Sequence, residues 1–310
     1  MTSSLRDKVV VVTGATRGCG RAIAVELGAL GATVYCCGRT TRARRSPMNR
    51  PETIEETAEL VDAVGGNGIA VRCDFTLLSD VDLLRGRLGS DVDGRLDVLV
   101  DDVWGGDSIH EFGVAFWESG LDKVLSMQRN CVETHVIALH WLLPLMVRAG
   151  SGLVVEVTDG DTDEYVGAGT SYYLVKCAVR ALGRALAIEL RPYGVVAMAV
   201  TPDFLRSEAM LEHFGVTEDN WWEASKISTD GDAAHFVMSE TPRYLGRGVA
   251  ALATDPRVSR FAGQTLASWT LMREYGFTDV DGSRPDFGRW MDEVYRTDTD
   301  PATVDTARYR

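Results

Sequence analysis

The sequence predicts an α/β protein in which a doubly wound parallel sheet of about seven strands carries helices on both faces. Strand-like runs alternate with helical ones along most of the 310 residues, which is the pattern of consecutive strand–helix–strand units. The first strand-like run, K-V-V-V-V-T at 8–13, is almost continuously apolar, as strands buried on both faces are. Hydrophobic residues make up 45% of the chain and charged residues 25%, a composition that suits a globular protein with an ample core.

The predicted elements follow one another in order along the chain. Strand-like runs occupy 8–13, 33–37, 69–73, 96–100, 153–157 and 195–200. Apolar residues recur at helical spacing in 21–30, 51–61, 79–88, 115–147 and 170–191. Pro51 opens the second of these helices, where its fixed φ suits a first helical turn.

We interpret residues 1–275 as one domain and residues 276–310, which are polar and rich in Asp and Arg, as a C-terminal tail. Residues 202–245 lack strong periodicity and are predicted to form a lid over the sheet. Within the lid, 204–214 has apolar residues at helical spacing, so a fixed surface helix is the alternative. Whether the tail reaches a neighbouring subunit is left open by the sequence.

Charge and cysteine usage narrow the class of protein. The net charge is −13, which disfavours a nucleic-acid partner because phosphate backbones need a basic face. The six cysteines show neither a C-x-x-C pair nor zinc-ligand spacing, so we expect reduced cysteines, no metal and a cytoplasmic location. No apolar signal segment starts the sequence, and no apolar run approaches the ~18 residues of a membrane span.

A glycine-rich turn, T-G-A-T-R-G-C-G at 13–20, lies between the first strand and the first helix. Glycines there let the backbone approach a pyrophosphate, and the unpaired N–H groups and dipole of the helix N-terminus favour an anion. Because the turn follows a strand and precedes a helix, it indicates a dinucleotide site more strongly than a glycine cluster alone would.

Together with Tyr172-x-x-x-Lys176, this turn resembles the short-chain dehydrogenase/reductase (SDR) superfamily over roughly residues 6–270. The stretches 251–256 and 273–282 resemble the branch that contains dehydrogenase/reductase SDR family member 1. The resemblance implies a Rossmann-type fold, a nicotinamide dinucleotide, a small carbonyl or alcohol substrate, and a homodimer or homotetramer. It also implies these cofactor contacts: Gly14, Thr16, Arg17, Gly18, Gly20, Arg39, Thr40, Asp74, Phe75, Asp101, Tyr172, Lys176 and Pro202.

The chain departs from the family pattern beside the expected cofactor. Asp101 stands where the family has the first Asn of Asn-Asn-Ala-Gly, beside the cofactor ribose, and an ionised acid accepts hydrogen bonds without donating them. Asp203 replaces the glycine that follows Pro202. Asn130 is the best match to the Asn of the family's proton relay, and a polar position on an exposed helix face is the alternative.

We expect Tyr172 and Lys176 to carry the proton step of an oxidoreductase, because residues four apart are neighbours on one helix face. A free tyrosine has a pKa near ~10, which is too high for efficient proton exchange at neutral pH. A nearby ammonium stabilises the phenolate and lowers that pKa. Tyr173 competes for the role but points about 100° around the helix.

Asp159 lies thirteen residues before Tyr172, where the family places the serine that donates a hydrogen bond to the substrate oxygen. An ionised Asp would repel a developing alkoxide by on the order of 5 kcal/mol at ~3 Å and an effective dielectric of ~20. Three ways remain in which the site could avoid this repulsion. An apolar pocket could keep Asp159 protonated as a hydrogen-bond donor, Thr158 could turn its hydroxyl inward, or the substrate could bring a cation or a hydrogen-bond donor. We favour retained redox chemistry with Asp159 in the place of the serine.

The cofactor is predicted to be NADP(H) rather than NAD(H). A site for NAD(H) places a carboxylate at the end of the second strand, whereas Y-C-C-G-R-T at 35–40 has no acid and has Arg39 at the turn. Arg17, inside the glycine-rich turn, is the second expected contact to the 2′-phosphate. The sequence therefore predicts an NADP(H)-dependent carbonyl reductase or alcohol dehydrogenase. The alternative is a cofactor-binding sensor or scaffold with little turnover.

Overall fold

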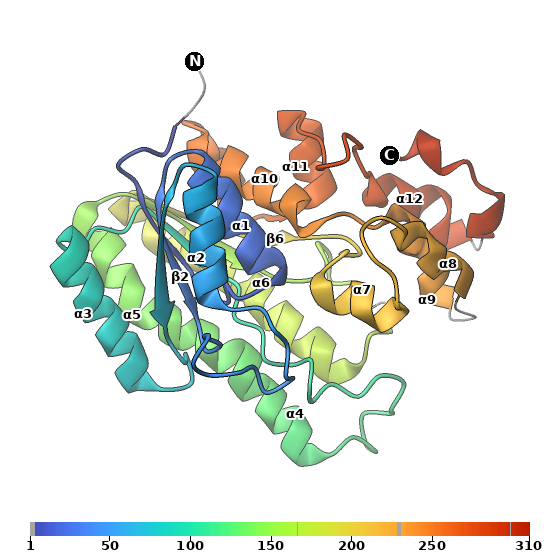
Figure 1. The fold of residues 1–310 in the computed structure, drawn as a ribbon, viewed down its shortest axis with the longest axis horizontal. Helices are drawn as coiled ribbons and strands as arrows, with labels where there is room; N and C mark the ends of the chain where they lie inside the picture. Colours follow the sequence, from blue (N-terminus) through green and yellow to red (C-terminus); the bar gives the residue numbers. More distant parts are fainter. Residues whose placement is uncertain (1–3, 166, 228–230, 298) are drawn as a thin grey trace.

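The computed structural model describes residues 4–165, 167–227, 231–297 and 299–310, and in these residues seven parallel strands form one sheet (Figure 1). The strand order is β3-β2-β1-β4-β5-β6-β7, so the direction of winding reverses between β1 and β4. The strands are β1 (Val9–Val12), β2 (Thr33–Gly38), β3 (Asn67–Arg72), β4 (Val98–Asp101), β5 (Gly152–Val157), β6 (Val195–Thr201) and β7 (Thr265–Ala267). The predicted doubly wound α/β fold is confirmed.

Helices connect the strands and cover both faces of the sheet. Those that follow β1 to β5 are α1 (Gly18–Ala29), α2 (Ile54–Ala63), α3 (Leu78–Val92), α4 (Leu121–Gln128), α5 (Thr134–Ala149) and α6 (Thr170–Leu190). After β6 come α7 (Glu208–Phe214), α8 (Ala224–Ile227), α9 (Gly231–Ala234), α10 (Pro242–Thr254), α11 (Ser268–Tyr275) and α12 (Phe287–Glu293). A π-helical turn, Arg129–Glu133, joins α4 to α5.

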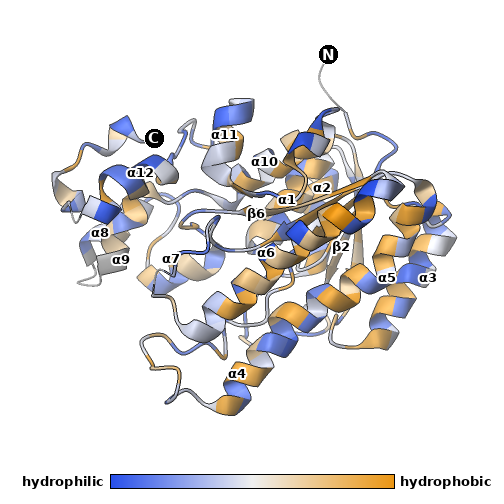
Figure 2. Ribbon diagram, turned by 180° about the vertical axis from the view of Figure 1, so that it is seen from behind, coloured by the Kyte–Doolittle hydropathy of each residue, from blue (hydrophilic) through white to orange (hydrophobic). Residues whose placement is uncertain are grey.

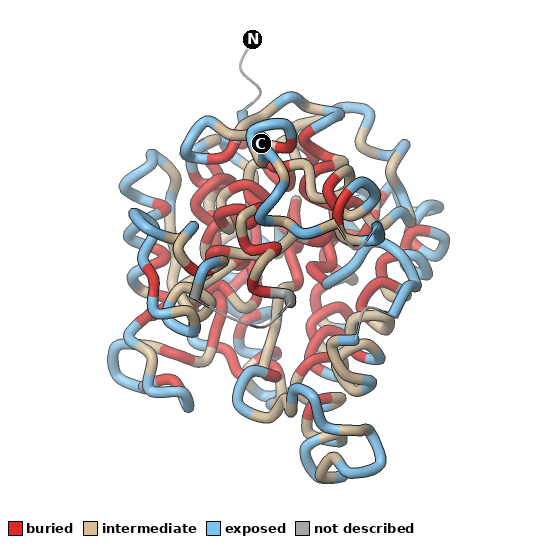
Figure 3. The backbone as a smooth tube through the Cα atoms, turned by 90° about the vertical axis from the view of Figure 1, so that its right-hand side faces the viewer, coloured by how far each residue is buried: buried red, intermediate tan, exposed pale blue. Residues whose placement is uncertain are grey.

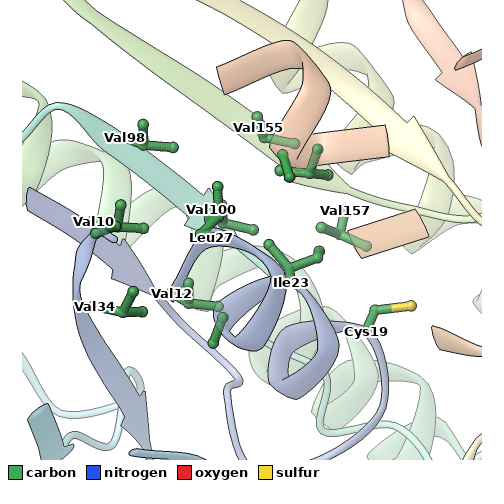
Figure 4. Packing of buried hydrophobic residues seen from close by; sticks show 14 of the residues in the cluster. Val10, Val12, Cys19, Ile23, Leu27, Val34, Val98, Val100, Val155 and Val157 are labelled. Carbon is green, nitrogen blue, oxygen red and sulfur yellow. The ribbon is translucent and has the colours of Figure 1, made fainter. Parts of the chain in front are cut away.

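Two apolar clusters form the core, one on each face of the sheet. Val10 and Val12 of β1 face Ile23 of α1 (Figure 4), in a cluster to which α2, α10 and α11 also contribute. Val9 and Val11 face the opposite side and pack with residues of α3, α5 and α6. Successive side chains of a strand point to opposite faces, so a strand covered on both sides is apolar throughout. The buried centre of the molecule is this three-layer arrangement (Figure 3).

The register of the sheet brings distant parts of the chain to one edge. Val12 of β1 pairs with Val100 of β4, Val100 with Val155 of β5, and Val155 with Met198 of β6. Because all these strands are parallel, the residues that follow them meet at the carboxyl edge beside the point where the winding reverses. Ligands of open α/β sheets bind at that edge.

One described helical stretch, Leu121–Ala149, is long and apolar enough to cross a membrane by length and composition. The sequence analysis expected no apolar run of that length, because polar residues interrupt the run; α4, the π-helical turn and α5 nevertheless form one continuous helix. Figure 2 shows this helix with hydrophobic and hydrophilic residues interspersed. Its Ala138, Leu139 and Leu142 pack against the sheet, which is the environment of a core helix in a globular protein.

The predicted lid and tail lie side by side (Figure 1). Residues 202–245 contain α7, α8 and α9, and residues 228–230 of this range lie outside the described residues. Trp290 and Tyr309 of the tail pack with Met238 of the lid in a separate apolar cluster. Arg310 donates hydrogen bonds from Nη1 to the carbonyl oxygens of Val237 and Ser239, at 3.1 and 2.9 Å. The described part of the tail therefore folds back on the lid of its own chain.

Candidate active site

The glycine-rich turn is closed on its inner side and open on its outer side. Gly14 has φ +64°, and a Cβ there would collide with the backbone carbonyl of Asp102. A Cβ at Gly20 would lie 2.5 Å from the carbonyl oxygen of Gly14. Gly18 has φ +57°, and a Cβ there would meet nothing within 4 Å. The turn thus packs tightly on the end of β4 while its outer surface can receive a ligand, as a pyrophosphate cradle requires.

The N-terminus of α1 already holds an anionic group. Arg17, at the N-cap, makes no side-chain capping hydrogen bond. Instead, the backbone N–H of Gly18 donates to Oε2 of Glu208 on α7, at 3.0 Å. Oε1 of Glu208 lies 3.8 Å from Nη1 of Arg21. A carboxylate from the lid therefore stands where a dinucleotide pyrophosphate is expected, which supports the fit of this helix end to an anion.

The two arginines expected at a 2′-phosphate differ in their partners. Arg17 donates from Nη2 to Asp107, at 3.0 Å, so its charge is already paired. Arg39, at the end of β2, is half-buried, and its side chain makes no hydrogen bond or ion pair with the described residues. Thr16 and Thr40 beside these arginines are buried, with 8% and 7% of their surface exposed. Arg39 is the better placed of the two cations for an added phosphate.

The residues expected near the adenine are only partly available. Asp74, after β3, is buried, and its Oδ1 accepts hydrogen bonds from the N–H and hydroxyl of Thr76, at 3.1 and 2.7 Å. The ring of Phe75 lies in the core cluster below the sheet, with 3% of its surface exposed. The side chain of Phe75 is therefore part of the core, and a cofactor contact of this residue stays a prediction. Pro202 follows β6 directly, at the carboxyl edge.

Asp101 lies in a buried cluster below the site. Its Oδ1 accepts a hydrogen bond from the Thr13 hydroxyl at 2.6 Å. Nδ1 of His135 lies 2.8 Å from Oε2 of Glu156 and 3.7 Å from Oδ1 of Asp101, and Nε2 lies 3.1 Å from the Val103 carbonyl oxygen. Burial raises the pKa of Asp101 to about 7. Burial alone would lower the pKa of His135, but the Asp101 and Glu156 carboxylates raise it to about 9.

Asp101, which the sequence predicts beside the cofactor ribose, has no exposed surface, and its contact with a cofactor stays a prediction. The sequence did not point to His135 or Glu156, because nothing in their spacing links them. Ligand atoms of the three residues lie within 4.8 Å of one another, a spacing that also suits a metal ion. Both nitrogens of His135 face acceptors, however, so a doubly protonated imidazolium between two carboxylates accounts for the group.

Tyr172 and Asp159 meet at the start of α6. The Tyr172 hydroxyl donates a hydrogen bond to Oδ2 of Asp159 at 2.6 Å. Nζ of Lys176 lies 4.2 Å from the ring centroid of Trp104 and 5.4 Å from that of Tyr172. Tyr173 instead turns its hydroxyl to the Asp163 carbonyl oxygen, at 2.5 Å. The structure therefore brings Tyr172, Lys176 and Asp159 together and turns Tyr173 away from them.

The surroundings of the Tyr172 phenol oppose its ionisation. Burial and the neighbouring Asp159 carboxylate raise the pKa of Tyr172 well above its usual value. The sequence analysis expected a lowered pKa, because Lys176 lies one turn away on α6. A phenolate beside an ionised carboxylate is repelled by it, and Asp159 is in direct contact with the hydroxyl while Lys176 is stacked over Trp104.

Two of the three ways in which the site could avoid repulsion by Asp159 lack support in the described residues. Thr158 is buried, and its hydroxyl donates to the Lys176 carbonyl oxygen at 2.9 Å, so it does not face the site. Asp159 is exposed, so it does not lie in an apolar pocket. The remaining alternative is a substrate that carries a cation or a hydrogen-bond donor.

Asn130 lies in the π-helical turn between α4 and α5. Its Nδ2 donates to the Gly105 carbonyl oxygen at 3.4 Å, and a Cβ at Gly105 would lie 2.9 Å from the Cβ of Asn130. The residue is half-buried against the loop after β4, so it does not lie on an exposed helix face. Single π-helical turns are frequent at functional sites because they shift the register of a helix face.

Arg180 is a residue of this site that the sequence analysis missed. Its side chain is buried, and Nη1 donates to the carbonyl oxygens of Asp159 and Gly160, at 2.9 and 3.3 Å. Nη2 pairs with Asp163 at 3.2 Å. Arg180 thus fixes the backbone of the loop that carries Asp159. Its position four residues after Lys176 and eight after Tyr172, on the same helix face, was the available signal.

A pocket adjoins Tyr172 on the side of the loop after β4. The ring of His110 lies 5.3 Å from that of Tyr172, measured between centroids. His110 lines the pocket with residues of the 109–127 segment and with Gly169, Thr170 and Ser171 at the start of α6. Burial lowers the pKa of His110. Within this segment Glu111 and Lys123 form an ion pair of 2.6 Å. This small pocket lies on the side of Tyr172 that faces the 109–127 segment.

Comparisons with known proteins show the family and the fold of this chain. The sequence matches the short chain dehydrogenase family over residues 8–214. It is 32% identical to human dehydrogenase/reductase SDR family member 1 over 287 residues, covering 91% of this chain and 86% of that protein. It is 27% identical to the short-chain reductase protein NovJ of Streptomyces niveus, over 90% of this chain and 95% of that protein. The fold is similar to that of a short chain dehydrogenase from Mycobacterium thermoresistibile, with a TM-score of 0.73, 21% identity, and coverage of 89% of this chain and 90% of that one.

Proposed function

The chain belongs to the short-chain dehydrogenase family, and from that premise we propose that it is an NADP(H)-dependent oxidoreductase acting on a polar double bond of a small molecule. The carbonyl/alcohol pair is the substrate type that the family resemblance implies. The observation that carries the proposal is the meeting of Tyr172, Lys176 and Asp159 at the same sheet edge as the glycine-rich turn.

Each residue of the site has a different role in the proposed hydride and proton transfer. The nicotinamide, when bound, supplies or accepts the hydride. Tyr172 holds the proton at its hydroxyl oxygen, and Lys176 provides the only side-chain cation within 5.4 Å of the Tyr172 ring among the described residues. Asn130 holds the loop after β4 against the π-helical turn between α4 and α5. Asp159 presents a carboxylate to the reacting group.

The preference for NADP(H) rests on Arg39. No acidic residue ends β2, whose sequence is T-V-Y-C-C-G, and Arg39 follows it with a guanidinium that has no partner in the described part of the chain. A phosphate accepts charge-assisted hydrogen bonds from a guanidinium, which are stronger than neutral ones. The ribose hydroxyl of NAD(H) would gain less from the same residue.

A second candidate function is a cofactor-binding protein with little turnover, acting as a sensor or scaffold. The raised pKa of Tyr172 favours it, because burial and Asp159 both disfavour the phenolate. Asp203, a half-buried acid in the place of a glycine, points the same way, because desolvation and the neighbouring Glu240 raise its pKa well above the usual value.

We also propose a cytoplasmic homodimer or homotetramer. The cysteines in the described residues are free, and all but Cys177 are buried, which suits a reducing compartment. Exposed apolar side chains lie on the outer side of the helices after β4 and β5, including Leu125, Val136 and Leu174. Such side chains on neighbouring helices suit an interface with a second subunit. Light scattering of the purified chain tests the oligomeric state.

The test combines binding with turnover. NADPH and NADH are titrated into the protein by calorimetry, and consumption of each is followed with a panel of ketones, aldehydes, quinones and imines. We expect tighter binding of NADPH and turnover of at least one class that Tyr172→Phe reduces. Binding without turnover of any class supports the sensor or scaffold, and no binding of either dinucleotide refutes both functions.

A further inference from the structure

We propose that Asp159 selects a substrate whose reacting group is a cationic C=N bond, a protonated imine, over a neutral ketone or aldehyde. The inference rests on the proposed oxidoreductase function and names its substrate class. It follows from what the carboxylate can accept, how it is held, and which charges surround it.

The Asp159 carboxylate has one oxygen engaged and one available. Oδ2 accepts the hydrogen bond of Tyr172 at 2.6 Å. Oδ1 has no hydrogen-bond partner among the described residues, and the side chain is exposed. A ligand that reaches the Tyr172 hydroxyl therefore meets this oxygen as well.

The carboxylate is held in place by the fold. Arg180 donates to the Asp159 and Gly160 carbonyl oxygens, and the Gly160 N–H donates to the Thr201 hydroxyl at 3.0 Å. Both partners come from elements of the sheet edge, α6 and β6. The loop can therefore present Asp159 in a fixed orientation, as selection by a single group requires.

An acceptor at this position suits a cation and not a carbonyl oxygen. Reduction of a ketone builds negative charge on oxygen, which needs donors around it, and an ionised Asp has no proton to donate. A protonated imine has an N–H that donates to a carboxylate in a charge-assisted hydrogen bond. Its positive charge disappears during reduction, so no anion develops beside Asp159.

The wider charge distribution favours the same ligand. The carboxylates of Asp159 and Asp107 both act on the Tyr172 phenol. Asp107 is paired with Arg17 at 3.0 Å, whereas Asp159 forms no ion pair with the described residues. Of the nearby cations, Arg180 is bound to the loop backbone and Asp163, and Lys176 is stacked on Trp104. Asp159 is thus the carboxylate beside Tyr172 whose charge is not paired within the described residues, and it attracts a positively charged substrate.

The step balances without a further reagent. The imine carbon accepts the hydride that the reduced nicotinamide supplies, and the π electron pair of the C=N bond becomes the lone pair of nitrogen. The N–H proton stays on nitrogen, so the cation becomes a neutral amine while the nicotinamide is oxidised. Asp159 holds the N–H throughout, and Tyr172 keeps its proton.

The first experiment measures binding and not turnover. Benzamidinium is a planar cation with N–H donors that cannot be reduced here, and benzamide is its neutral carbonyl counterpart. Calorimetry of the full chain with NADP⁺ present should give a Kd for benzamidinium at least ~10-fold below that for benzamide, which corresponds to one charge-assisted hydrogen bond. Asp159→Asn should abolish this preference. Asp161→Asn, the same charge change two residues away on the same loop, should keep it.

A second experiment separates substrate class from function. With NADPH, the 3,4-dihydroisoquinolinium cation should be reduced faster than acetophenone by the wild type. Asp159→Ser should reverse the order by lowering kcat/KM for the cation and raising it for the ketone, an opposite pair of changes that a merely misfolded variant does not give. Equal binding of benzamidinium and benzamide, or no binding of either, overturns the proposal. If the ligands bind equally or not at all but the wild type reduces the ketone, the imine proposal is wrong and the oxidoreductase function remains supported. If the wild type reduces neither substrate and binds no dinucleotide, both the imine proposal and the oxidoreductase function are wrong.

Discussion

The Tyr172 hydroxyl donates a hydrogen bond of 2.6 Å to the carboxylate of Asp159, thirteen residues earlier in the chain. The pair joins the first turn of α6 to the loop after β5, so an acid and a phenol share the place where a substrate would react. Lys176 lies one turn further along the same helix, over the ring of Trp104. This arrangement determines what each substitution in the site should do.

Replacement of Tyr172 tests the proton-donor role. Tyr172→Phe should lower kcat by on the order of 10²-fold or more, because positioned general acid–base groups contribute about that much. Tyr173→Phe is the matched control, since its hydroxyl bonds to the Asp163 carbonyl oxygen outside the site, and it should change kcat little. Steady-state kinetics with the best ketone or aldehyde of the panel, whose oxygen must gain a proton on reduction, measures both. Full activity in Tyr172→Phe would contradict the proton-donor role of Tyr172.

Removal of Arg39 tests the cofactor preference. Arg39→Ala should weaken NADPH binding by roughly 10- to 10²-fold, the effect of one charge-assisted hydrogen bond to a phosphate, and should leave NADH binding unchanged. Arg17→Ala should have a smaller effect, because Asp107 already pairs with that guanidinium. Arg44→Ala, in the exposed part of the same loop, is the control and should bind both dinucleotides as the wild type does. Equal affinity of the wild type for NADH and NADPH contradicts the prediction.

The contact between Glu208 and the N-terminus of α1 predicts competition with the cofactor. Glu208→Gln should tighten NADPH binding by about 2- to 5-fold, because a charge at a helix N-terminus contributes ~0.3–1 kcal/mol and the cofactor must displace it. Glu212→Gln changes the same charge on the same helix, but Glu212 pairs with Arg50 rather than with α1, so binding should stay as in the wild type. Calorimetric titration of NADPH measures the difference. Weaker binding in Glu208→Gln would mean that Glu208 supports the bound cofactor.

The buried cluster of Asp101, His135 and Glu156 predicts how stability depends on pH. The pKa of His135 is raised from its ordinary 6.5 to about 9, so folding binds its proton more tightly. The stabilisation is therefore complete below about pH 6.5 and is lost as the pH rises through about 9. The wild type should lose on the order of 1–3 kcal/mol of unfolding free energy over this range, at ~1.4 kcal/mol per unit of pKa. Asp101, with its pKa raised to about 7, acts in the same direction at lower pH.

Urea unfolding at several pH values measures this loss. Glu156→Gln removes one of the two carboxylates that raise the pKa of His135, so its unfolding free energy should fall less between pH 6.5 and 9. Glu118→Gln, an exposed residue far from the cluster in sequence, should show the same pH dependence as the wild type. A wild type whose stability is flat over this interval would show that His135 is not held as a cation.

The sequence by itself determined the local features of this protein. The apolar run at 8–13 predicts a strand buried on both faces, and in β1 alternate valines do pack into the two opposite cores. The glycines of 13–20 predict a close approach of backbones, and Gly14 meets the Asp102 carbonyl. The four-residue spacing of Tyr172 and Lys176 places both on one face of α6. Each of these depends on sterics and periodicity within a few residues, which a sequence states directly.

Only the tertiary structure decided which distant side chains meet. The strand order sets β4 beside β1 and β5, and this brings Asp101 to Thr13 and His135. Glu208 reaches Gly18 across 190 residues because the segment after β6 folds back over the carboxyl edge. Helical and strand periodicities fix which face a residue occupies, but the partner across that face depends on how the elements are ordered in the sheet. Side chains whose partners in the site are distant in sequence, such as Arg180 and Glu208, therefore acquire their roles only when the chain is folded.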